Sequence, residues 1–420
     1  MSKMLNCSWL IKVLLAIETF LLILSPKGVK ALIGYEGVWF NPQFIFMFLI
    51  LPLLIVCKAF DFTKLKKIEA NIYLSYVFLI CGLYFLATLV AISSTPVDVY
   101  YPLSESVRQT LNFLLVFLPI LYLRQEYTSF LIKFIITLGL FELSFVAYGL
   151  LGAFGYTPIP EFLREVVSSQ IHNQSWTALG FFPKWGGTFP ETQLLSTFIL
   201  MCYVFTDIVL KSKRVGVRIL KLLFIVSIIY LQSKSAIIGL TIYLIFSSGK
   251  VYRYIFSPIA IFGAVYFIYR AGSKEFASML NLSSLESMAL QYYSFSERLF
   301  HIIKSIEYMS HNIIQLLFGL GPRTYGTILS MEYPGVFGPY SNAISIFNVM
   351  SDLGIIGFLV FISFLIFLYK GIGISKLKIA YISVLISYAL QAAWGESFIF
   401  MFLALLLGYD KIIRIRRYNK

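Results

Sequence analysis

A glycine-containing turn in the second half of the chain has the residue types of an anion-binding site. It runs from Leu317 to Gly326 and includes Gly319, Gly321 and Arg323. Glycine favours tight turns. The backbone N–H groups of such a turn can surround an anion, and Arg323 would add positive charge. The same residues are equally typical of a turn that only ends a helix.

The segment before this turn, Ser294 to Phe318, has the period of a helix and starts with the capping-box pattern Ser294-Phe295-Ser296-Glu297. One face is apolar, and a second face with the same spacing carries Arg298, His301, Ser305, Tyr308 and Asn312. We expect a single helix lying on the membrane surface with this polar face in water. The alternative is that the polar face contributes Arg298 and His301 to a site.

Three shorter segments also carry polar residues at the ends of apolar runs. Lys234 lies in the turn Ser233-Lys234-Ser235-Ala236, where a cation needs a partner or must reach water by snorkelling. The segment Trp185 to Gln193 includes Thr188 and Glu191, and Pro190 and Glu191 also suit the start of a helix. The third segment contains Tyr340-Ser341-Asn342 and then Asp352-Leu353-Gly354-Ile355-Ile356-Gly357.

Apolar helices must position these segments. Of the 420 residues, 59% are hydrophobic and 13% are charged, and the mean hydropathy of +0.83 is far from that of a soluble domain. Runs of about 17 to 25 apolar residues predict transmembrane helices, and they are too continuous for barrel strands. We predict an all-α, polytopic transmembrane bundle with about 12 spans, near 9–25, 43–57, 71–92, 110–123, 129–152, 191–210, 216–232, 235–249, 254–270, 343–369, 378–394 and 397–409.

Lys and Arg residues indicate the orientation of these spans. The net charge is +14, and most of the cations fall on one side of the membrane when both termini are placed in the cytoplasm. The charge therefore reflects topology, and no nucleic-acid partner is expected. The expected units are N-terminal helices (1–152), a first extracytoplasmic loop (153–190), central helices (191–270), a second extracytoplasmic loop with an amphipathic helix (271–342), and C-terminal helices with a basic tail (343–420).

Taken in order, these segments resemble the O-antigen ligase/polymerase superfamily of bacterial surface polysaccharide assembly (Wzy-type). The matching residues are Gly187-Thr188-Phe189, Ser233-Lys234-Ser235-Ala236, Arg298 with Phe318-Gly319-Leu320-Gly321, and Asn342 with Asp352-Leu353-Gly354-Ile355-Ile356-Gly357. The resemblance covers about residues 180 to 360. Two positions depart from the family pattern, because Lys234 replaces an arginine and Ser341 replaces a histidine. The missing histidine disfavours a ligase.

The resemblance implies a glycosyltransferase that polymerises oligosaccharide repeat units linked to a polyprenyl diphosphate, such as undecaprenyl diphosphate. The products would be O-antigen of lipopolysaccharide, capsule or exopolysaccharide. It implies catalytic roles for the cations Arg298 and Lys234. For the general base that would accept the acceptor proton, Glu191, His301 and His311 are candidates by residue type. It also implies binding of diphosphate or sugar by Arg323, Arg270, Gly319, Gly321, Thr188, Tyr325 and Asn342. Fixed cations would stabilise the departing diphosphate, so no metal or cofactor is expected to be needed. The resemblance also implies that the transfer inverts the anomeric carbon.

The implied location is the bacterial plasma (inner) membrane, with multiple spans and the site outside. Partners would be the lipid-linked oligosaccharide, membrane lipid, a chain-length regulator and a flippase of the same pathway. Two alternatives stay open. One is a ligase that transfers finished polymer to a lipid acceptor. The other is a polysaccharide-lipid transporter or flippase, which Glu18 and Glu142 favour because they lie near the middle of predicted spans.

Overall fold

The computed structural model is helical almost throughout. The described residues are 2–23, 42–64, 67–95, 97–153, 177–178, 182–183, 189, 192–210, 215–231, 233–247, 294–337, 345–391 and 396–418. Within them, the only paired strands longer than one residue are β1 (Thr177–Ala178) and β2 (Phe182–Pro183), which are antiparallel. The all-α class predicted from the sequence is confirmed.

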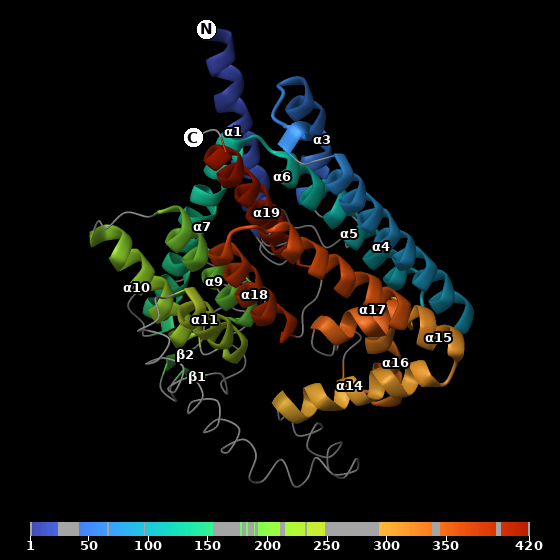
Figure 1. The fold of residues 1–420 in the computed structure, drawn as a ribbon. Helices are drawn as coiled ribbons and strands as arrows, with labels where there is room; N and C mark the ends of the chain where they lie inside the picture. The colour runs from blue at the N-terminus through green and yellow to red at the C-terminus, as the bar shows by residue number, and fades with distance from the viewer. Residues whose placement is uncertain are drawn as a thin grey trace.

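The helices follow one another along the whole described chain (Figure 1). Those of the first half are α1 (Ser2–Ile23), α3 (Pro42–Val56), η1 (Phe62–Lys64), α4 (Lys67–Ser94), α5 (Tyr100–Leu111), η2 (Asn112–Phe117), α6 (Leu118–Tyr122) and α7 (Gln125–Ala153). Those of the second half are α9 (Thr192–Val209), α10 (Val215–Tyr230), α11 (Lys234–Ser247), α14 (Ser294–Ser310), α15 (Ile313–Phe318), α16 (Thr324–Glu332), α17 (Ser345–Gly371), α18 (Ser375–Ala389) and α19 (Ser397–Tyr418).

Several of these helices have the length and composition of membrane spans. Among the described residues, 4 helices meet both criteria, and they cover Ile68–Ser94, Gln125–Tyr148, Thr192–Val209 and Ser345–Gly371. Large apolar side chains also stand exposed on the bundle, with Phe48 67%, Leu89 64% and Leu359 58% exposed. Such a surface is favourable in hydrocarbon and unfavourable in water. The fold is that of a helical membrane protein.

Helix α9 forms the centre of one half of the bundle. It packs against α7, α10, α11 and α18, and its side chains are buried on every face, including Phe198, Met201 and Phe205. A helix that is apolar all round must be covered by lipid or by other helices, and for α9 the neighbouring helices provide this cover. Because α9 begins at Thr192, its buried position fixes the residues at its N-terminus, and Gln193 is one of them.

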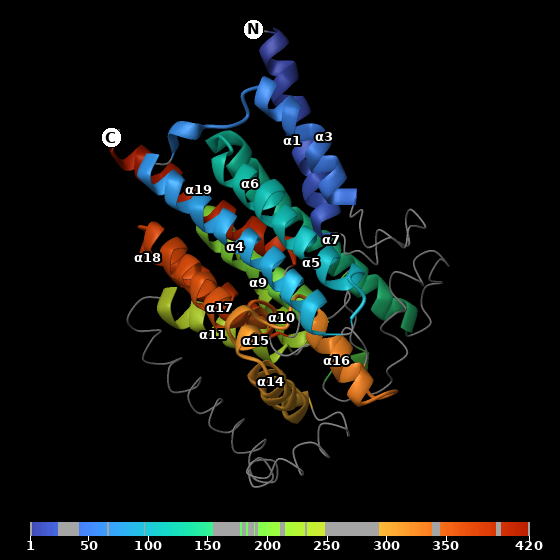
Figure 2. The same ribbon diagram turned by 90° about the vertical axis from the view of Figure 1, so that its right-hand side faces the viewer.

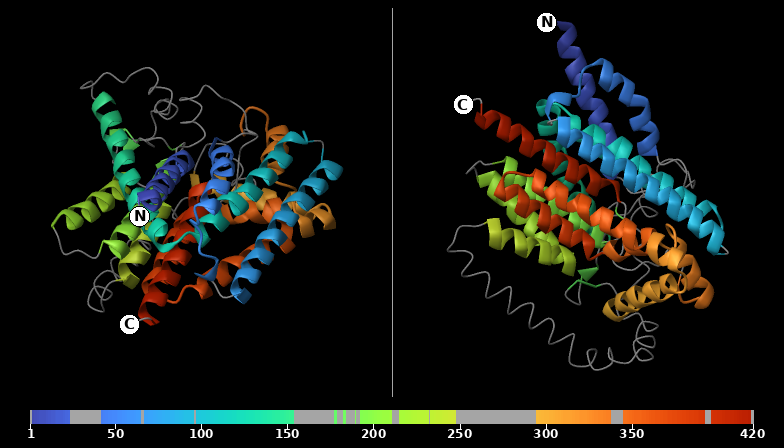
Figure 3. Two further views of the ribbon diagram at one scale, coloured as in Figure 1. Left: turned by 90° about the horizontal axis from the view of Figure 1, so that it is seen from above. Right: turned by 45° about the vertical axis from the view of Figure 1, so that its right-hand side comes forward.

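The two termini lie at the same end of the bundle, and the opposite end, called here the distal end, carries α14, α15 and α16 (Figure 1). Helices α4 and α5 lie side by side and reach the distal end close to α16 (Figure 2). Helix α14 runs across this end (Figure 3). The three helices α14 to α16, called here the distal module, enclose a small core of their own, formed by Phe300, Tyr308, Met309, Leu320, Tyr325, Leu329 and Phe337.

The single helix predicted for Ser294 to Phe318 is instead two helices. Helix α14 ends at Ser310, and α15 starts after Asn312, which has extended backbone angles (φ −141°, ψ 128°). The Asn312 side chain accepts a hydrogen bond from the N–H of Ile314 at 2.9 Å. An asparagine that caps a new helix in this way interrupts the preceding one, although the apolar periodicity continues across the break.

Candidate functional site

Arg298 joins the distal module to two segments that are distant in the sequence. Its Nη1 donates to the backbone oxygen of Leu390 at 2.8 Å, and its Nη2 donates to the side-chain oxygen of Gln193 at 2.9 Å. Both acceptors are neutral, so these two contacts orient the planar guanidinium without adding a negative charge. The side chain is half-buried. A cation held in this way is preorganised to bind an anion at the distal end.

Gln391, which follows α18, links several of the segments that surround Arg298 by hydrogen bonds. Its amide nitrogen donates to the backbone oxygen of Gln193 at 3.0 Å, to the hydroxyl of Thr197 and to the hydroxyl of Ser235 at 3.3 Å. Its own backbone oxygen accepts from the N–H and the hydroxyl of Ser345, at 2.5 and 2.8 Å. We call the linked side chains the distal polar cluster, which consists of Gln193, Thr197, Ser233, Ser235, Arg298, Ser387 and Gln391.

The turn that contains Lys234 contacts the distal polar cluster through Ser233 and Ser235, the residues on either side of Lys234. Ser233 and Ser235 are buried, their hydroxyls lie 3.0 Å apart, and the Ser233 hydroxyl accepts from the N–H of Ala236 at 3.4 Å. Ser233 therefore caps α11, and Lys234 is the first residue of that helix. The Lys234 side chain is exposed. The structure thus brings the backbone of the Lys234 turn and the Arg298 side chain to one cluster, linked through Ser235 and Gln391.

The glycine turn after α15 packs tightly against α17. The N–H of Gly319 donates to the oxygen of Gln315, and the N–H groups of Leu320 and Gly321 donate to the oxygens of Ser351 and Asp352, at 2.7, 2.8 and 3.2 Å. Helix α17 offers these oxygens because it kinks at Gly354, which has φ 68°. The three N–H groups already have acceptors, contrary to the expectation that Gly319 and Gly321 would present theirs to an anion.

Arg323 belongs to a second group of charges at the distal end. Its Nε lies 2.8 Å from a carboxylate oxygen of Glu105 on α5, and Arg108 binds the same carboxylate with Nε and Nη2. Burial raises the pKa of Glu105, but Arg108 and Arg323 outweigh it and lower that pKa from 4.5 to about 2. Arg323 also has a left-handed backbone (φ 58°), which is costly for a non-glycine residue. The Glu105 carboxylate therefore offsets part of the positive charge that Arg323 was expected to offer to a substrate anion.

His301 lies inside the distal module. It is 2% exposed, its Nδ1 lies 2.8 Å from the hydroxyl of Tyr325, and its ring contacts Phe300 and Phe337. Ser305 and Tyr308, predicted on the same wet face, are also buried. That part of the expectation is wrong: the polar face of α14 packs onto α16, and apolar Ile306 is 40% exposed. His301 and Tyr325 are thus hydrogen-bonded core residues, and Arg298 points away toward Gln193.

The remaining residues of the predicted site, Glu191, Thr188, Arg270 and Asn342, lie outside the described residues. Four side chains were missed. Gln193 had a signal, since it closes the segment with Thr188 and Glu191, whereas Gln391 and Glu105–Arg108 carry no motif. Gln391 lies near Arg298, and Glu105 and Arg108 lie near Arg323, only because of the way the helices pack.

Two further observations concern metal and transport chemistry. Within the described ranges, no group of three or more His, Cys, Asp or Glu side chains is arranged to hold a metal ion. Glu18 on α1 and Glu142 on α7 are each 2% exposed, and neither carboxylate oxygen of Glu18 has a hydrogen-bond partner.

Comparison with known proteins gives no match to a family model or to a curated protein.

Proposed function

We propose that the chain is a bacterial surface polysaccharide polymerase that joins polyprenyl-diphosphate-linked oligosaccharide repeat units at the outer face of the plasma membrane. The observation that supports this function best is the fixed position of Arg298 beside the Lys234 turn, at the end of the bundle away from the termini. Segments more than 60 residues apart in the sequence supply these cations, in agreement with the motif order of the family that the chain resembles.

The proposed topology has about 12 spans, both termini in the cytoplasm and the distal end outside. In the proposed reaction, the acceptor hydroxyl of one repeat unit attacks the anomeric carbon of another with inversion. A C–O bond forms to the acceptor, the C–O bond to the diphosphate breaks, and the hydroxyl proton passes to a base. Negative charge grows on the departing diphosphate. Arg298, which Leu390 and Gln193 hold in place, stabilises it together with the exposed side chain of Lys234.

The identity of the base is a separate part of the proposal. Glu191 is the stronger candidate by position, because it immediately precedes α9 and lies two residues from Gln193, the partner of Arg298. His301 is enclosed by aromatic rings and bonded to Tyr325. A buried imidazole in that position would have to move before it could reach an acceptor hydroxyl.

The test is reconstitution of the purified protein in liposomes with a lipid-linked repeat unit as the only substrate. The expected result is a ladder of polymer without added metal or nucleotide. Arg298→Ala and Lys234→Ala should each reduce the rate about a hundredfold or more. Lys304→Ala, which changes a cation bonded to Glu332 elsewhere on the distal module, should leave the rate unchanged.

Two other results would replace the proposal. Transfer of preformed polymer to a lipid acceptor, without growth of the chain, would identify a ligase. Movement of the intact lipid-linked substrate across the liposome membrane, without any new glycosidic bond, would identify a transporter. The buried carboxyl of Glu18 is the observation that favours a transporter, and Glu18→Gln would abolish movement in that case.

A further inference from the structure

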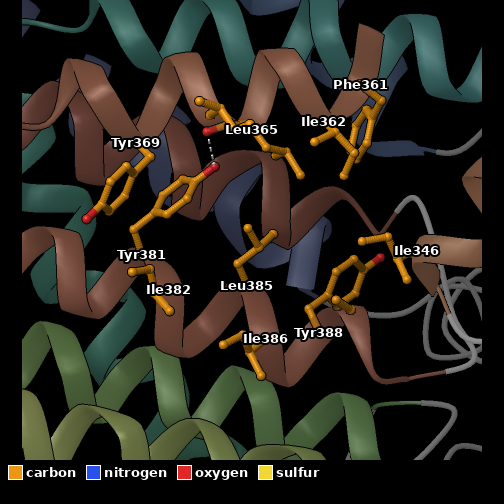
Figure 4. Close-up of a pocket in the computed structure, with 12 residues that line it drawn as sticks. Ile346, Phe361, Ile362, Leu365, Tyr369, Tyr381, Ile382, Leu385, Ile386 and Tyr388 are labelled. Atoms are coloured by element: carbon orange, nitrogen blue, oxygen red, sulfur yellow. Dashed lines mark hydrogen bonds between the residues drawn. The ribbon is translucent and has the colours of Figure 1, made fainter. Parts of the chain in front are cut away.

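A hollow of about 360 Å³ lies between α17 and α18 (Figure 4). Its walls come from both helices, with Phe361, Leu365 and Tyr369 on α17 facing Tyr381, Leu385 and Tyr388 on α18. Ile366 at its edge is 49% exposed, so the hollow opens onto the surface of the bundle. We call it the α17–α18 groove.

Two of the three tyrosines that line the groove, Tyr381 and Tyr388, use their hydroxyls in hydrogen bonds within the protein. The Tyr381 hydroxyl donates to the backbone oxygen of Leu365 at 2.8 Å, across the two helices (Figure 4). The Tyr388 hydroxyl accepts from the N–H of Glu396 at 2.9 Å. The rings therefore present carbon to the groove, and its accessible lining is entirely apolar. A sugar or phosphate would lose its hydration here without compensation, whereas a hydrocarbon chain would bury apolar surface.

One end of the groove adjoins the distal polar cluster. Ile346 follows Ser345, which bonds to the backbone of Gln391, and Ala389 precedes Leu390, whose oxygen binds Arg298. On α18 the groove continues from Ala389 back to Tyr381, which is about 12 Å at 1.5 Å per residue. The guanidinium of Arg298 thus lies near one end of the apolar α17–α18 groove.

We propose that the α17–α18 groove holds the isoprenoid chain of the lipid-linked donor, while Arg298 binds its diphosphate. This inference rests on the proposed function and deepens it, because it assigns the two halves of one substrate to adjacent surfaces. The charge of Arg298 selects an anionic headgroup, and the apolar lining accepts the first few isoprene units. The anomeric carbon then lies on the far side of the diphosphate, toward the exposed part of the distal end.

The test uses two donors with the same repeat unit, one on a full-length polyprenyl chain and one on a geranyl chain. Ile382 lines the groove at the end remote from Arg298, so Ile382→Trp fills a part that only the longer chain reaches. For this variant, kcat/KM with the full-length donor should fall about tenfold or more, and kcat/KM with the geranyl donor should not change. Leu359→Trp, on the exposed face of α17 outside the groove, is the matched control and should affect neither donor.

The geranyl donor also shows whether Ile382→Trp folds, because a misfolded variant would lose activity with both donors. A second measurement keeps the test decisive if the variant loses activity with both donors. Native mass spectrometry compares how much full-length polyprenyl phosphate and how much phosphatidylglycerol the protein retains. The wild type should retain polyprenyl phosphate preferentially, and Ile382→Trp should remove this preference. Equal retention of both lipids, or an unchanged preference in the variant, would overturn the assignment of the groove. If wild type polymerises neither donor, the proposed function fails, and the binding experiment still decides what the groove holds.

Discussion

A Cβ atom on Gly319 would lie 2.6 Å from the backbone nitrogen of Gly354, and a Cβ on Gly354 would lie 2.4 Å from the backbone nitrogen of Gly319. Both residues have positive φ, at 89° and 68°. The turn after α15 and the kink of α17 therefore fit together only without side chains. Since Arg298 reaches Gln193 from the same distal module, this contact helps to set the position of the cation.

Gly319→Ala should destabilise the protein by about 3 kcal/mol or more, because it adds a backbone clash to an unfavourable backbone conformation. The matched control is Gly335→Ala, which has φ 80° but nothing within 4 Å of the added Cβ. It should cost only about 1 to 2 kcal/mol. Thermal unfolding in detergent measures both variants. Equal losses would mean that the contact with α17 contributes nothing.

Gln193→Glu should abolish most of the proposed polymerase activity without loosening Arg298. The new carboxylate would keep the hydrogen bond to the guanidinium and would cancel its charge, so the rate should fall about a hundredfold. Gln193→Met has similar length and no charge, and because Arg298 keeps its contact with Leu390, we expect a loss of about tenfold or less. Initial rates in liposomes provide the comparison. A fully active Gln193→Glu variant would show that the charge of Arg298 is not used.

His301→Gln should retain the proposed polymerisation, because a glutamine can still hydrogen-bond to Tyr325 inside the distal module. His301→Leu leaves the Tyr325 hydroxyl without this partner and should cost about 1 to 3 kcal/mol of stability. Unfolding temperature and rate are measured on the same preparations. If His301 is the general base, both variants lose the reaction, and the loss in His301→Gln occurs with stability unchanged.

The helical membrane class was predictable because it depends only on long apolar runs, and such runs leave the backbone no alternative in lipid. The break between α14 and α15 at Asn312 was not predictable, because the apolar period continues through this residue and only the cap geometry reveals the break. The burial of His301 was also not predictable from the sequence. A polar stripe has the same spacing whether it faces water or packs against α16.

The candidate site was only partly predictable for a similar reason. Arg298 and Lys234 stand out because charges are rare in this sequence. Gln391 bonds to Gln193, Thr197 and Ser235. It does not stand out in the sequence, because an isolated glutamine belongs to no pattern that predicts a partner. The glycines at 319 and 354 were noticed as motif residues. Their role in packing becomes clear only when the two segments are seen in contact.

The group around Glu105 predicts a dependence of stability on pH. Its pKa in the folded protein is about 2, below the ordinary 4.5, so its stabilising effect is complete above pH 4.5 and is lost as the pH falls toward 2. A shift of this size corresponds to about 3 kcal/mol at ~1.4 kcal/mol per unit. The unfolding temperature in detergent should therefore drop between pH 5 and pH 3.

Other carboxylates titrate in the same range, so the assignment needs the Glu105→Gln variant. The variant leaves Arg108 and Arg323 without their shared carboxylate and should lose about 3 to 5 kcal/mol at pH 7. It should also show a weaker dependence on pH, because the group responsible is gone. Glu307→Gln changes a carboxylate that is 42% exposed and pairs with Lys304 at the surface, and it should behave like wild type. If Glu105→Gln and wild type lose stability in parallel from pH 5 to pH 3, Glu105 is not the group that titrates.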